Sequence, residues 1–170
     1  VAANAILINL VFLSAFILDA YAFSTEGIVG YSLGKKDLNL FKNIVKNSFI
    51  LSSISGLIIS IIFFLTNNFV INFMSDIDEI RKLSSSYVIW LIILPVISSF
   101  CYQFDGIFIG ASQTKELRNA MIFSVLVYLL ISILLIKFLF NTGIWISLCI
   151  FMILRAISLF WYLNRIYLRF

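Results

Sequence analysis

Residues 1–33 read VAANAILINLVFLSAFILDAYAFSTEGIVGYSL, a nearly unbroken apolar stretch with only two charged side chains. A helix needs about 20 apolar residues to cross the roughly 30 Å hydrocarbon core of a bilayer, and this stretch is longer. Similar stretches follow, which predicts five membrane helices over about residues 1–33, 44–65, 79–110 (apolar from about Tyr87), 114–140 and 143–166. The sequence therefore predicts an all-α, polytopic membrane protein.

The composition indicates the same class of protein. Hydrophobic residues make up 62% of the 170 residues and charged residues 12%, about half the charged share of a soluble domain. The chain has no histidine, so any proton chemistry must fall to carboxylates. Cys101 and Cys149 lie within apolar stretches, where packed thiols are expected rather than a disulfide or a metal site.

Basic residues between the helices predict the orientation of the chain. Eight of them fall on one side if the five helices alternate in direction: Lys35, Lys36, Lys42, Lys46, Lys115, Arg118, Arg165 and Arg169. The other side holds three basic residues diluted by acids. The positive-inside rule then places residues 34–46, 112–119 and the C-terminus in the cytoplasm. Residues 67–75 are expected to form an interfacial helix on the outer side.

Three acids lie inside the predicted membrane helices, where a charge costs several kcal/mol. Asp19 and Glu26 are two helical turns apart and share a face. Glu26 precedes Lys35 by nine residues and Asp105 precedes Lys115 by ten, which predicts similar depths for Glu26 and Asp105 and a deeper Asp19. Two carboxylates facing each other across a cavity share a proton or bind a cation. The competing interpretation is structural, with each acid capped by hydroxyls, backbone or Arg155.

Other polar and small residues in the apolar helices are candidates for supporting roles. Pro95 removes a backbone hydrogen bond and predicts a hinge or a tolerated kink. Gly106 and Gly110 form a GxxxG step that lets helices approach closely. Candidates for lining a substrate cavity, for which simple packing is the commoner role, are Tyr21, Tyr102, Gln103 and Tyr128.

Two stretches carry a family resemblance: residues 18–37, LDAYAFSTEGIVGYSLGKKD, and residues 94–121, LPVISSFCYQFDGIFIGASQTKELRNAM. They resemble the second half of the multidrug and toxic compound extrusion (MATE) family, and most closely its bacterial branch of the DNA-damage-inducible protein F type. That branch shows an L-D-G-x-A-x-x-x-E pattern and, two helices later, a P…D-G-x-x-x-G-A…R-N pattern. Ala20 stands where the first pattern has Gly.

The resemblance implies most of one six-helix lobe of a twelve-helix antiporter, with one preceding helix and the whole N-terminal lobe lying outside this sequence. It implies efflux of drugs or other organic compounds in exchange for H⁺ or Na⁺, with no other cofactor and no enzymatic activity. Asp105 matches the family's second-lobe cation-binding acid, and Asp19 and Glu26 match acids of the branch. The implied surroundings are the lipid bilayer of a bacterial inner membrane.

Two alternatives remain open at the level of sequence. A lipid-linked saccharide flippase of the same superfold would use Arg155 as its basic cavity residue. A non-transporting membrane subunit would use the acids to hold helices together. The sequence has no GxxxxGK[ST] phosphate loop, no metal-ligand cluster and no Ser-His-Asp set. Its basic loops are short topology signals, so nucleic acid is not expected as a partner.

Overall fold

The computed structural model describes residues 1–168, which form six helices and no strand. The helices are α1 (Ala2–Gly34), α2 (Leu38–Met74), α3 (Asp78–Ser86), α4 (Val88–Gly110), α5 (Thr114–Leu139) and α6 (Asn141–Tyr167). Five of them, all except α3, are long and apolar enough to cross a membrane. The prediction of an all-α polytopic membrane protein is therefore confirmed.

Short turns reverse the chain between the long helices. The turns after α1, α4 and α5 each contain a residue with positive φ, namely Lys36 (53°), Ser112 (55°) and Phe140 (50°). The side chain of Asp37 caps α2 by accepting a hydrogen bond from the backbone N–H of Leu40 at 2.9 Å, which satisfies one of the unpaired donors of the first turn. The long helices therefore alternate in direction.

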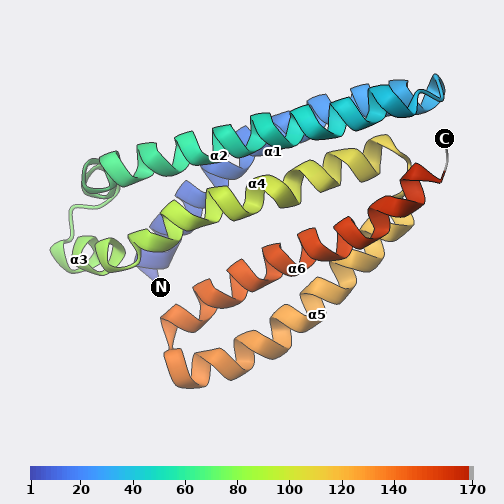
Figure 1. Ribbon diagram of the computed structural model, residues 1–170. Helices are drawn as coiled ribbons and strands as arrows, with labels where there is room; N and C mark the ends of the chain where they lie inside the picture. The colour runs from blue at the N-terminus through green and yellow to red at the C-terminus, as the bar shows by residue number, and fades with distance from the viewer. Residues whose placement is uncertain (169–170) are drawn as a thin grey trace.

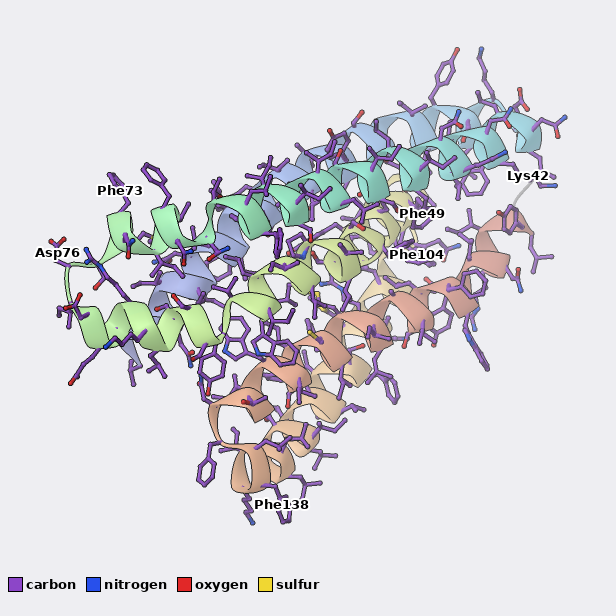
Figure 2. All side chains as sticks on the ribbon, turned by 60° about the vertical axis from the view of Figure 1, so that its left-hand side comes forward. Lys42, Phe49, Phe73, Asp76, Phe104 and Phe138 are labelled. Atoms are coloured by element: carbon purple, nitrogen blue, oxygen red, sulfur yellow. The ribbon has the colours of Figure 1, made fainter. Side chains whose placement is uncertain are left out.

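Alternation gives the bundle two chemically different ends (Figure 1). The turns at residues 35–37 and 111–113 lie with the end of α6 on one side, which we call the basic end. The start of α1, the helix α3 and the turn between α5 and α6 lie at the opposite end. Figure 2 shows Lys42 at the basic end and Asp76 at the opposite end. The turns that carry most of the described basic residues thus lie at the same end, as the predicted alternation of the helices requires.

The helices form two groups joined mainly through α4. Helices α1, α2 and α4 pack on one another, and α5 and α6 form an antiparallel hairpin that meets this group mainly through α4. Phe49 of α2 and Phe104 of α4 point toward one another (Figure 2), with ring centroids 4.8 Å apart. They belong to an apolar cluster near the basic end, and a second cluster fills the opposite half with residues such as Leu7, Leu91 and Trp145.

Two predicted helices differ from the structure. The predicted helix 79–110 is divided at Tyr87 into α3 and α4. Helix α3 is short and charged, and only α4 is long and apolar enough for a membrane span. The predicted interfacial helix 67–75 is wrong: residues 67–74 continue α2. Nothing in this segment breaks the helix, and the Asn67 side chain donates to the Phe64 carbonyl of the same helix at 2.5 Å. The short, strongly amphipathic helix on this side is α3 instead.

Candidate functional site

Two glycines bring the backbones of α1 and α4 into contact. Gly106 lies against the backbone of Ala22, and Gly110 lies against the backbone of Glu26, so that a Cβ atom at either glycine would overlap α1. Small residues permit this close approach between membrane helices. The GxxxG step therefore has the packing position predicted for it, and it fixes how α1 and α4 are aligned along their length.

This alignment corrects the predicted depths of the acids. The pairs Ala22–Gly106 and Glu26–Gly110 have the same sequence offset, which places Asp105 level with residue 21. Asp19 is then about 3 Å from the level of Asp105 and Glu26 about 7.5 Å, at a rise of ~1.5 Å per residue. The prediction that Glu26 and Asp105 lie at similar depth, with Asp19 apart from them, is wrong: Asp19 is nearer to the level of Asp105, because α1 continues to residue 34 whereas α4 ends beside Glu26.

The carboxylate of Asp105 is paired with an arginine rather than with Glu26. Arg155 Nη2 of α6 donates to Asp105 Oδ2 at 2.6 Å, and each side chain is only 11% exposed. Asp105 Oδ1 and Arg155 Nε are also buried and have no hydrogen-bond partner among the described residues. The pair is therefore strong but incompletely satisfied, since each group has a polar atom left over.

All three membrane acids nevertheless line one cavity. Asp19, Glu26, Asp105 and Arg155 surround a space of about 180 Å³ between α1, α4, α5 and α6. Leu117 represents α5 in this lining, and the remaining walls are apolar or glycine. Three carboxyl groups and one guanidinium leave an excess of negative charge when all are ionised. In surroundings of low dielectric such an excess favours uptake of a proton or a cation.

The four predicted substrate-cavity residues lie in separate surroundings. Tyr21 lines a groove of about 320 Å³ between α1 and α2, together with Thr25, Asn43 and Asn47. Gln103 is fully buried and accepts a hydrogen bond from Thr25 Oγ1 at 2.9 Å. Tyr102 packs against the apolar cluster of the opposite half, and Tyr128 meets Phe151 edge-on with ring centroids 5.9 Å apart. Only Tyr21 of the four lies in a groove that also carries several polar side chains.

Pro95 lies in the part of α4 that α2 contacts through hydrogen bonds and a glycine. The hydroxyl of Ser60 donates to the carbonyl of Ile92 at 2.7 Å, and the hydroxyl of Ser52 donates to the carbonyl of Ser99 at 3.3 Å. Gly56, between these serines, faces the carbonyl of Pro95. The proline segment of α4 is thus held by the small-residue face of α2, and its action as a hinge stays a prediction.

Two polar contacts of this bundle were not anticipated from the sequence. Thr25 joins Gln103 to the groove between α1 and α2. At the opposite end, the side-chain amides of Asn4 and Asn141 are hydrogen-bonded to each other, and Trp145 Nε1 donates to Asn4 Oδ1 at 3.4 Å. A polar side chain within an apolar stretch is the one sequence signal that singles these residues out, and it does not identify their partners.

Comparison with known proteins gives a family match and a curated relative. A model of the MatE family matches residues 1–135. The chain is 32% identical over 159 residues to the protein named DNA damage-inducible protein F from Escherichia coli (strain K12). That alignment covers 94% of this chain and 34% of the relative, so the chain spans about a third of the length of the relative. No solved structure matches.

Proposed function

The chain belongs to the MatE family, and from this premise we propose that it is part of a secondary antiporter. The antiporter exports drugs or other organic compounds, and H⁺ or Na⁺ moving in the opposite direction drives the export. No chemical reaction is catalysed. The observation that carries this proposal is the membrane-embedded cavity lined by Asp19, Glu26, Asp105 and Arg155.

The charge balance of the cavity favours a cation as the coupling ion. Arg155 neutralises one carboxylate, and the cavity holds two more. A carboxylate charge within a membrane helix is costly, and binding a proton or a metal cation removes or balances that charge. Carboxylate oxygens are suitable ligands for both H⁺ and Na⁺. Binding from one side of the membrane and release to the other would couple ion flow to export.

Arg155 acts in this proposal as a built-in cation for Asp105. In the described conformation its guanidinium occupies Oδ2 of Asp105, and Asp19 and Glu26 hold the exchangeable charge. Alternating access in such transporters requires rocking of helix groups against one another. A shift of α6 away from α4 would withdraw Arg155 and expose Asp105 to a proton or a sodium ion. During the antiport cycle Asp105 would then bind the Arg155 guanidinium and the coupling ion, H⁺ or Na⁺, in turn.

The Asp105–Arg155 ion pair also disfavours the flippase alternative. A flippase cavity needs basic groups that are free to bind pyrophosphate, whereas Arg155 is already bonded to Asp105 at 2.6 Å. The groove that contains Tyr21, Asn43 and Asn47 offers hydroxyl and amide groups instead. Its lining combines apolar side chains with uncharged polar ones, which suits an organic substrate that carries a few hydrogen-bonding groups.

Transport in proteoliposomes tests the proposal. The full-length protein is reconstituted, an H⁺ or Na⁺ gradient is imposed, and movement of a fluorescent cationic dye is followed. Glu26→Gln and Asp105→Asn are each expected to abolish gradient-driven transport while the protein still inserts and purifies. Glu79→Gln, on the exposed surface of α3, is the matched control and should transport normally. Wild-type transport by both cavity variants would refute the proposal, and binding of a lipid-pyrophosphate without dye transport would favour the flippase.

We further propose that the basic end lies in the cytoplasm of a bacterial inner membrane. The described part of this end carries seven of the eight basic residues counted from the sequence, and the eighth, Arg169, lies outside the described residues. The positive-inside rule relates such an excess to the cytoplasmic side. A reporter enzyme that is active only in the periplasm, fused to the C-terminus, is expected to be inactive. An active fusion would show that the C-terminus lies in the periplasm and would contradict the proposed orientation.

A further inference from the structure

A groove runs between α5 and α6 near the basic end and has no part in the acid-lined cavity. Its volume is about 610 Å³, and its lining is Asn119, Ala120, Phe123, Ile157, Ser158, Trp161, Tyr162 and Arg165. We propose that this groove binds an anionic phospholipid of the surrounding bilayer. The proposal rests on the membrane location of the chain and does not depend on its transport activity.

Polarity changes along the groove in the way an amphipathic ligand requires. Arg165 lies at the end nearest the helix terminus, with its guanidinium 5.1 Å from the ring centroid of Tyr162. Trp161 beside it is 78% exposed. Ile157 lies two turns deeper, about 12 Å from Arg165 at ~1.5 Å per residue. A headgroup at Arg165 would therefore place its acyl chain along the deeper, apolar part of the groove.

Charge at the mouth of the groove matches an anionic headgroup. Arg118 is exposed and donates to Asn119, a lining residue, at 3.5 Å. Arg165 uses Nη1 to bind Glu116 at 3.0 Å, yet its side chain remains 59% exposed. A guanidinium has five N–H donors, so Arg165 retains donors for a phosphate. Lys115 lies on the same turn of α5 as Arg118. Lys115, Arg118 and Arg165 therefore outnumber the one nearby acid, Glu116. Basic pockets of this kind between membrane helices bind anionic headgroups.

The surroundings of α5 favour a lipid over free phosphate. Within the described residues α5 buries only Ala120, Ser124 and Ser132. Eleven of its other side chains are large, apolar and exposed, and Phe123 belongs both to this face and to the groove. Free phosphate would satisfy the arginines but leave the apolar part of the groove uncovered. Tryptophan and tyrosine at this level are also typical of residues at the membrane interface.

Native mass spectrometry of the full-length protein tests the site, with dioleoylphosphatidylglycerol as the anionic probe and dioleoylphosphatidylcholine as the neutral one. The anionic lipid is expected to bind more tightly. Arg118→Gln and Arg165→Gln should each weaken its binding about fivefold, from ~1 kcal/mol per basic residue near a charged lipid surface. Lys35→Gln/Lys36→Gln removes two charges from the same end outside the groove and should leave binding unchanged.

A second variant separates the site from misfolding caused by loss of the Arg165–Glu116 pair. Ser158→Phe fills the groove while retaining every charge, and it should reduce binding of the anionic lipid at an unchanged melting temperature. Equal binding of both lipids, wild-type binding by Ser158→Phe, or equal losses in the lysine control would each overturn the proposal. Displacement of the lipid by millimolar inorganic phosphate would identify a phosphate site instead. Asp105→Asn should bind the lipid normally, because Asp105 lies outside this groove. Lipid binding and antiport can therefore be tested independently.

Discussion

Helix α4 is joined to α1 and to α6 in opposite ways. Against α1 it presents Gly106 and Gly110, whose missing side chains let the two backbones touch. Against α6 it presents Asp105, whose carboxylate reaches Arg155. Backbone contact of the first kind exists at one alignment only, because any shift brings side chains into collision. An ion pair can be exchanged for a proton or another cation, so we infer that α1 and α4 move together and that α6 is the mobile partner.

The largest expected effect comes from breaking the ion pair on one side. Arg155→Leu leaves the buried Asp105 carboxylate unpaired and should lower the free energy of unfolding by about 3–5 kcal/mol. Asp105→Leu/Arg155→Leu should lose much less, because no charge remains buried. Denaturant unfolding of the full-length protein in bicelles at pH 8 measures both. Equal losses in the single and double variants would show that the pair does not join α4 to α6.

The glycine contact is expected to give the next largest effect. Gly106→Ala places a Cβ atom into the Ala22 backbone and should cost about 1–3 kcal/mol, the usual range for overpacking. Gly27→Ala is the matched control, because a Cβ atom there meets no atom within 4 Å and alanine favours helix more than glycine does. The same unfolding measurement compares them. If Gly106→Ala and Gly27→Ala unfold with the same free energy, the glycine contact does not fix the alignment of α1 and α4.

The amide pair at the opposite end is expected to add a smaller link between α1 and α6. Asn141→Leu removes the hydrogen bonds between Asn141 and Asn4 and should cost about 1 kcal/mol, within the range for hydrogen bonds between membrane helices. Asn164→Leu, an exposed position on the same helix, should be neutral. If Asn141→Leu is equally neutral, the amide pair does not help to hold α6 against α1.

The smallest expected effect concerns the contact between α2 and α4. Ser60→Ala removes the 2.7 Å hydrogen bond to the Ile92 carbonyl and should cost about 0.6 kcal/mol, the average for such bonds in a membrane protein. Ser85→Ala, exposed on α3, serves as its control in the same unfolding assay. A loss of about 3 kcal/mol or more would equal the effect expected from breaking the ion pair.

Much of the fold was predictable because it depends on local properties of the chain. Apolar length indicates which segments can cross the membrane, and the alternating direction of the successive long helices places the basic turns at one end. Predictions failed where a boundary depended on surroundings. Residues 67–74 extend α2 although they are more polar than the segment before them, and Tyr87 divides α3 from α4.

The cost of placing Asp19, Glu26 and Asp105 in a membrane can be deduced from the amino-acid sequence, because it depends on the residue type and on the apolar stretch around it. Which groups offset that cost depends on how the helices pack. Asp105 pairs with Arg155, which lies 50 residues further along the chain, and the glycine contact sets its depth nearer to Asp19 than to Glu26. Packing between helices determines both the partner and the depth of Asp105. Neither can be deduced by counting residues to the nearest loop.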